Sequence, residues 1–127
     1  MRPLALFLIC LSLLTVQVGA APGNTIFDYA QELGLSQEQA KRIRETLDHH
    51  SKLSASTQTD LARAEGAFQR AAASNATVEQ IKPLLENVRD CRIRLRFQDV
   101  ETARKLEGLL SEEQRKGWQA IQKRETR

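Results

Sequence analysis

The chain has 127 residues, a length that suits a single domain. Its 19 Lys and Arg residues face 16 Asp and Glu residues, giving a formal charge of +3. This balance is too even for nucleic acid to be the main partner. The composition therefore predicts one domain that does not bind nucleic acid.

The N-terminal 20 residues have the order of a secretory signal peptide. A short charged start precedes an apolar run over 4–14, and small residues at 18–20 indicate cleavage near Ala20. The apolar run is too short to span a membrane. We therefore expect a mature domain over 21–127 that is exported to the periplasm without stable membrane insertion.

The two cysteines indicate neither a lipid anchor nor a disulfide scaffold. Ile9 precedes Cys10 where a lipoprotein signal has a small residue, so lipidation of Cys10 is not expected. Cys91 is the single cysteine of the mature chain and cannot form an internal bridge. Two interpretations of Cys91 stay open: a small buried apolar residue or an intermolecular link.

Four helices account for the mature sequence. Thr25 is placed to cap a short first helix over 26–33, which Gly34 would end. Ser36, with Gln39 three residues later, forms a capping box that starts a long second helix. The Ser/Thr-rich run over 51–59 is a poor helix former, so a bend or interruption there is one alternative.

The second helix carries a seam of residues spaced by three and four, typical of a helix that packs against a partner helix. The seam is apolar at both ends and polar in the middle. Its members are Ala40, Ile43, Leu47, His50, Ser54, Thr57, Leu61, Ala64, Phe68 and Ala71.

A turn over 74–76 and a capping box of Thr77 with Gln80 predict a third, long helix. Pro83 lies in its first two turns and favours a kink or a later start. Ser111 then opens a short last helix that carries Trp118. The packing face expected for the third helix consists of Ile81, Leu84, Leu85, Val88, Cys91, Leu95, Thr102, Leu106 and Leu109.

One short phrase occurs twice, as Leu35-Ser36-Gln37-Glu38-Gln39 and as Leu110-Ser111-Glu112-Glu113-Gln114. The midpoint between Leu35 and Leu110 is 72.5, close to the expected turn near residue 75. An antiparallel hairpin about 50 Å long would therefore bring both copies together at its open end. We expect an all-α, elongated antiparallel helical hairpin whose open end is closed by short capping helices at both termini. The expected structural motif consists of Leu35, Ser36, Gln39, Leu110, Ser111 and Gln114.

This pair of phrases, flanking a long helical hairpin after a signal peptide, resembles the paired LTxxQ motif of the Spy/CpxP family of periplasmic proteins. Both copies here have serine, Ser36 and Ser111, where that motif has threonine, which keeps the capping chemistry. The resemblance spans nearly the whole mature chain. It implies a curved helical hairpin that forms a homodimer.

The resemblance also implies two kinds of function. One is an ATP-independent chaperone or envelope-stress response protein, whose partners would be unfolded client proteins, a sensor kinase or an anti-sigma factor. The alternative is a heavy-metal sensor or resistance protein, whose cofactor would be a divalent transition metal. We expect no cofactor under the first function.

A second stripe on the third helix is the candidate protein-binding site. Apolar residues fall together on a helical wheel there, with arginines around them, which is typical of an interface. Burial in a homodimer and contact with unfolded clients both stay open. The stripe consists of Arg89, Ile93, Arg96, Phe97, Val100 and Arg104.

In the hairpin register, His50 would face Asp99 and Thr102, which predicts a polar layer within the seam. His50 and Asp99 are also the weak candidates for a metal site. His49 points about 100° away from His50 on a helix and cannot readily share its ion. The structural interpretation of the layer is favoured over metal binding.

The sequence predicts no enzyme. It has no glycine-rich phosphate loop, no nucleophile elbow and no Cys-His pair at a recognisable spacing. Its carboxylates fit ion pairs on helix faces, such as Glu38 with Arg42. We expect the protein to act through surface contact.

Overall fold

The computed structural model describes residues 26–127, and these residues form an all-α hairpin. A 3-10 helix η1 leads into α1, and two long helices are followed by a shorter one. The expected all-α hairpin is confirmed, while the signal peptide and the Thr25 cap lie outside the described residues. The elements are η1 (Ile26–Tyr29), α1 (Ala30–Leu33), α2 (Gln37–Ala72), α3 (Val78–Gly108) and α4 (Glu112–Glu125).

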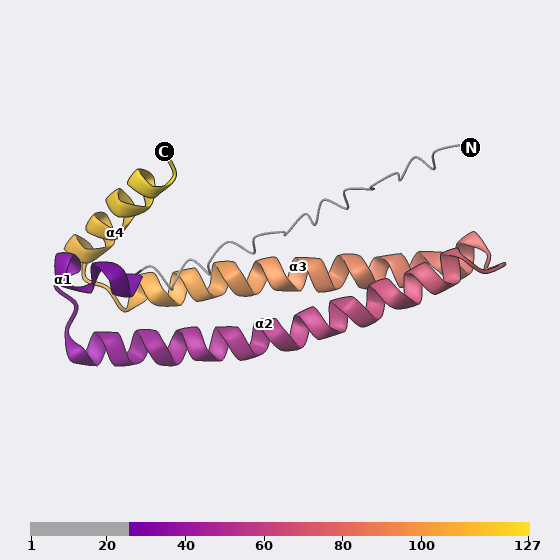
Figure 1. Cartoon of the computed structure of the whole chain (residues 1–127), viewed down its shortest axis with the longest axis horizontal. Helices are drawn as coiled ribbons and strands as arrows, with labels where there is room; N and C mark the ends of the chain where they lie inside the picture. Colours follow the sequence, from indigo (N-terminus) through magenta and orange to yellow (C-terminus); the bar gives the residue numbers. More distant parts are fainter. Residues whose placement is uncertain (1–25) are drawn as a thin grey trace, which may run out of the picture.

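The two long helices lie antiparallel along each other and meet at a tight tip over 73–77 (Figure 1). The short helices α1 and α4 lie together at the opposite, open end, and α4 projects away from the hairpin axis. Residues 26–127 are therefore two helices thick over most of the length of the hairpin and become thicker at the head formed by η1, α1 and α4.

The predicted start and stop signals are present. Ser36, Thr77 and Ser111 each accept from the backbone N–H three residues on, and the glutamine at that position bonds back to the backbone N–H of the cap. Gly34 ends α1 with φ 66°, a conformation that glycine adopts without steric cost.

Both long helices are continuous through the segments where the sequence left a break or a later start open. α2 continues through 51–59, where the hydroxyls of Thr57 and Thr59 each donate to the carbonyl four residues before, at 3.1 Å. These bonds stay within the helix, so the alternative of an interruption is wrong, and α2 continues with a smooth curve (Figure 1). The predicted later start at Pro83 is also wrong, because α3 begins at Val78 and runs through that proline.

The core is divided into two apolar clusters along the hairpin. The cluster at the open end is built around Ile43, which has no exposed surface, and Trp118. The cluster nearer the tip is centred on Cys91, packed with Ala64 and Val88. Cys91 is 2% exposed, so its interpretation as a buried apolar residue is confirmed.

One residue of the expected packing face is misplaced. Leu85 is 50% exposed, whereas Ile81, Leu84 and Val88 are wholly or partly buried. On a wheel of 100° per residue, Leu85 lies about 90° from the centre of the buried face. It therefore belongs to the outer side of α3.

The two copies of the repeated phrase meet through their glutamines, which we call the glutamine clasp. Gln39 Nε2 donates to Gln114 Oε1 at 2.8 Å, and Gln114 Nε2 donates to Gln39 Oε1 at 3.1 Å. Gln39 Nε2 also donates to the carbonyl of Leu109 at 3.0 Å, and Gln114 Nε2 to the carbonyl of Gly34 at 3.2 Å. Each carbonyl belongs to the second residue before the cap serine of the opposite copy, so the arrangement is pseudo-two-fold.

The terminal helices add contacts around this clasp. The Tyr29 and Trp118 rings lie 6.4 Å apart between centroids, and Arg124 pairs with Glu32 at 3.2 Å. The Tyr29 hydroxyl donates to the carboxylate of Glu125, and this hydrogen bond raises the pKa of Tyr29 because the phenolate could not make it. The head is thereby held together by both termini of the described chain.

Replacing Gln114 by Glu tests the glutamine clasp while the helix cap at Ser111 is kept. A glutamate keeps the acceptor for the Ser111 N–H but loses the donor to Gln39 and Gly34. We expect the free energy of unfolding at neutral pH to fall by about 1–3 kcal/mol, measured by urea titration.

Gln80→Glu is the matched control, because the Thr77–Gln80 box has the same cap geometry and the Gln80 side chain forms no hydrogen bond to another described helix. It should change stability by less than about 0.5 kcal/mol. Equal losses in the two variants would show that the clasp adds nothing beyond helix capping.

Candidate protein-binding surface

The six residues predicted as a binding stripe lie together on the outer face of α3, and we call them the α3 strip. The apolar members are strongly exposed: Ile93 by 59%, Phe97 by 66% and Val100 by 57%. The arginines at 89, 96 and 104 are exposed as well. Nothing in the described hairpin covers this surface.

The strip faces away from α2. On the helical wheel its centre lies about 150° from the centre of the buried face that contains Val88, Cys91 and Leu106. Contact with α2 would therefore require rotating α3 by almost half a turn. The strip is an outward ridge and not part of the seam.

Two of the three arginines have acidic neighbours on α3 itself. Arg89 pairs with Asp90 and Arg104 pairs with Glu107, each at 3.1 Å, while Arg96 has no ion pair among the described residues. All of these side chains are solvated, so the pairs contribute little to stability. Their guanidinium groups remain available to an acidic partner.

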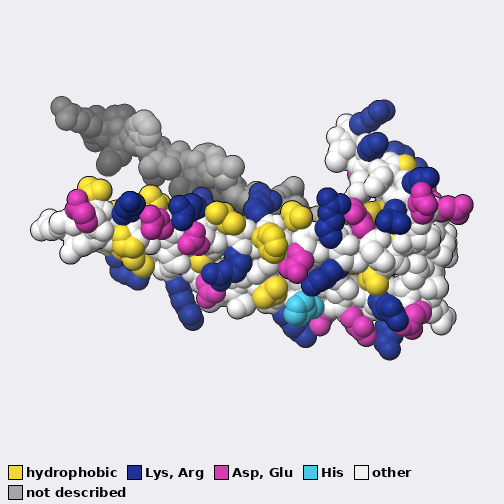
Figure 2. Space-filling view, turned by 180° about the vertical axis from the view of Figure 1, so that it is seen from behind, with side chains coloured by type: hydrophobic (Ala, Val, Ile, Leu, Met, Phe, Trp, Pro, Cys, Tyr) yellow, Lys and Arg dark blue, Asp and Glu magenta, His cyan; other side chains and the backbone are white. Residues whose placement is uncertain are grey.

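The exposed ridge is longer than the sequence prediction. Val78, Lys82 and Leu85 continue it toward the tip, and Val78 and Leu85 are 77% and 50% exposed. The signal that could have found Lys82 is its seven-residue spacing from Arg89 and Arg96, and Val78 and Leu85 are themselves seven residues apart. Figure 2 shows one face of the hairpin, on which separate hydrophobic side chains alternate with charged side chains.

A polar layer crosses the seam between the two apolar clusters. His50 Nε2 lies 3.2 Å from Asp99 Oδ1, and His50 Nδ1 lies 3.0 Å from the Thr102 hydroxyl. A carboxylate only accepts, so Nε2 carries a proton and donates, and Nδ1 of the neutral ring accepts from Thr102. The predicted facing of His50 with Asp99 and Thr102 is confirmed.

The second half of the layer is formed by Thr57 and Gln98, which are 3% and 6% exposed. Gln98 Nε2 donates to Thr57 Oγ1 at 2.8 Å. The side-chain carbonyl of Gln98 is buried and has no hydrogen-bond partner among the described residues. Within the described residues, the polar layer thus leaves one buried acceptor, Gln98 Oε1, without a hydrogen bond.

These residues offer few ligands to a metal ion. His50 and Asp99 supply two donor atoms that already bond to each other, and the described residues contain no group of three or more potential ligands. His49 lies elsewhere, beside a shallow groove. The predicted separation of the two histidines is confirmed.

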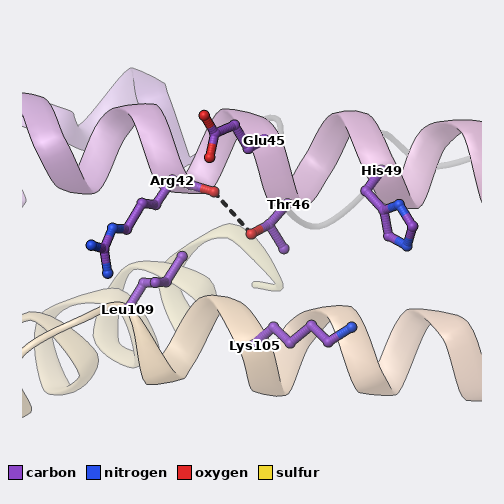
Figure 3. A pocket seen from close by; sticks show the side chains of 6 residues that line it. All are labelled: Arg42, Glu45, Thr46, His49, Lys105 and Leu109. Atoms are coloured by element: carbon purple, nitrogen blue, oxygen red, sulfur yellow. Dashed lines mark hydrogen bonds between the residues drawn. The ribbon is translucent and has the colours of Figure 1, made fainter.

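That groove has a volume of about 450 Å³ and lies between α2 and α3 (Figure 3). Arg42 and Lys105 border it, but they pair with Glu38 at 3.1 Å and Glu101 at 3.7 Å. The Thr46 hydroxyl donates to the Arg42 carbonyl at 2.9 Å. The side chains do not converge on one point, so the groove is a weaker candidate than the strip. Its lining consists of Arg42, Glu45, Thr46, His49, Lys105 and Leu109.

No family of known proteins, no curated protein and no solved structure matches this chain. The resemblance to the Spy/CpxP family therefore stays a prediction that rests on the paired phrase and the hairpin. Within residues 26–127, no helix combines the length and the apolar character that crossing a membrane requires.

Substituting Thr57 and Gln98 one at a time tests this description of the polar layer. Thr57→Val removes the acceptor of Gln98 and leaves both ends of that buried amide unpaired, so the free energy of unfolding should fall by about 1–3 kcal/mol. Gln98→Leu removes the unpaired carbonyl, while the Thr57 hydroxyl still donates to Leu53. Urea titration should show Gln98→Leu to be at least as stable as the parent chain, and a loss equal to that of Thr57→Val would contradict this account.

Proposed function

We propose that this protein is a periplasmic, ATP-independent chaperone or envelope-stress protein that binds unfolded or partner proteins on the α3 strip. The observation that carries the proposal is the exposure of Ile93, Phe97 and Val100 in one row on the outer face of a long, well-supported helix. Exposed apolar surface rimmed by arginine is typical of protein interfaces.

The energetics of the strip suit reversible binding. Burying one large apolar side chain contributes about 1.5–3 kcal/mol, and three such contacts are partly offset by the lost freedom of the two partners. The arginines attract acidic segments over a Debye length of about 8 Å at physiological ionic strength. Neither contribution requires a chemical step, so hydrolysis of ATP is not needed.

The proposal predicts that the mature protein suppresses aggregation of a chemically denatured client without ATP, as measured by light scattering. Phe97→Asp should weaken suppression about tenfold, because it places a charge at the centre of the apolar row. Leu53→Asp is the matched control, since Leu53 is an exposed leucine on α2, at 39%. Unchanged aggregation at several-fold molar excess of the parent protein would rule out the chaperone activity.

The alternative of a heavy-metal sensor or resistance protein depends on His50 and Asp99. An ion there would have to displace the hydrogen bonds to Asp99 and Thr102, which hold both ring nitrogens. These two hydrogen bonds are the reason that we propose the metal function only as the alternative.

Calorimetric titration decides between these functions. With Zn, Ni, Co or Cu ions at neutral pH, we expect no stoichiometric binding that His50→Ala removes, because two ligands already bonded to each other make a poor metal site. Stoichiometric binding that is lost in His50→Ala would support the metal function instead.

A further inference from the structure

On the outer face of α3, basic residues and apolar residues each recur at intervals of seven. Lys82, Arg89 and Arg96 follow one another at intervals of seven and form a basic line along one flank. Ile93 and Val100 have the same interval, and Phe97 lies between them, one turn from each. Such a period is typical of a helix that packs lengthwise against another helix.

The shape of this face also favours a helix as the partner. The strip points away from α2, and together with Val78, Lys82 and Leu85 it forms a convex ridge one helix wide. This ridge is about 39 Å long from Val78 to Arg104. A second helix packs along such a ridge at about 8–10 Å between axes, with its own side chains on both sides of the ridge. An extended chain has its side chains on a two-residue period, so it contacts the ridge at single side chains but cannot match it continuously over this length.

The charges argue for a partner other than a second copy of this chain. A two-fold axis between antiparallel copies sets each flank against the same flank of the other copy, so the basic lines would face each other. A parallel pairing would set Arg89 beside Arg94 but Arg96 beside Glu101, so it mixes like and unlike charges. The antiparallel arrangement leaves like charges together, whereas an acidic helix offers an opposite charge to all three residues of the basic line.

We propose that the α3 strip is a docking ridge for an amphipathic α-helix of a partner protein, with an apolar face flanked by Asp and Glu residues at seven-residue intervals. This inference rests on the proposed function, because it names the class of partner that the same surface selects. Phe97, Ile93 and Val100 pack into the apolar face of the incoming helix. Arg89, Arg96 and Lys82 pair with its acidic flank.

The test uses synthetic helices of about 28 residues, which match the length of the ridge. The first has leucine and isoleucine on one face and glutamate on both flanks, where mutual repulsion prevents self-pairing. The second has lysine in place of every glutamate. The third has the composition of the first in a scrambled order without a seven-residue period. Binding to the mature protein is measured by fluorescence anisotropy at two salt concentrations.

The acidic helix should bind at least about tenfold more tightly than either control peptide, and its affinity should fall as salt rises. Arg89→Glu combined with Arg96→Glu should weaken it about tenfold, and Phe97→Asp by a similar factor. Arg115→Glu, on the exposed side of α4, should leave the affinity unchanged. Circular dichroism of each variant confirms that its helices are intact.

Failure of this inference is distinguishable from failure of the proposed function. If a denatured client binds and Phe97→Asp releases it, while the acidic helix binds no better than the scrambled peptide, the helical partner is ruled out and the proposed function stands. If Phe97→Asp affects neither the client nor the helix, the strip is not the binding surface and both proposals are wrong.

Two other occupants would also overturn the inference. A dimer in sedimentation velocity that Phe97→Asp dissociates would show that a second copy covers the strip. Binding of the protein to phosphatidylglycerol vesicles, lost in the double arginine variant and without preference for the acidic peptide, would assign the strip to a lipid surface.

Discussion

The fold depends on one reciprocal hydrogen bond pair, between the side-chain amides of Gln39 and Gln114. Each glutamine uses its oxygen to cap its own helix and its nitrogen to bond across the open end. An amide is the side chain that can do both, since it has an acceptor and two donors. The clasp therefore couples the start of α2 to the start of α4.

This coupling fixes the register of the whole hairpin. With the tip closed at 73–77 and the open end clasped, a shift of α3 along α2 would break the cross-chain pairing at both glutamines. His50 is then held opposite Asp99, and Thr57 opposite Gln98. These polar pairs favour the same register, because any other would bury their donors and acceptors without partners.

Much of this architecture follows from local sequence rules. The three capping boxes and the three-and-four spacing of the seam predict the helices, because these signals depend on residues within a few turns. The facing of His50 with Asp99 follows from the position of the turn, which sets the register of the two helices. Leu85 was assigned to the wrong face because it adjoins Leu84, and hydrophobicity alone cannot separate two neighbouring leucines that lie 100° apart. The course of α3 through Pro83 also lay beyond local rules, since packing across the seam overrides a single lost hydrogen bond.

The two long helices differ in the number of large apolar residues that they expose, and this difference bears on function. α2 exposes one large apolar residue, Leu53, whereas the outer face of α3 exposes Val78, Leu85 and the three apolar residues of the strip. A two-helix hairpin buries just the seam, so residues opposite the seam add nothing to its stability. Polar residues would serve the folded monomer better there, because exposed apolar rows promote association. The proposed contact with another molecule would account for this row, and the basic line beside it would favour an acidic surface.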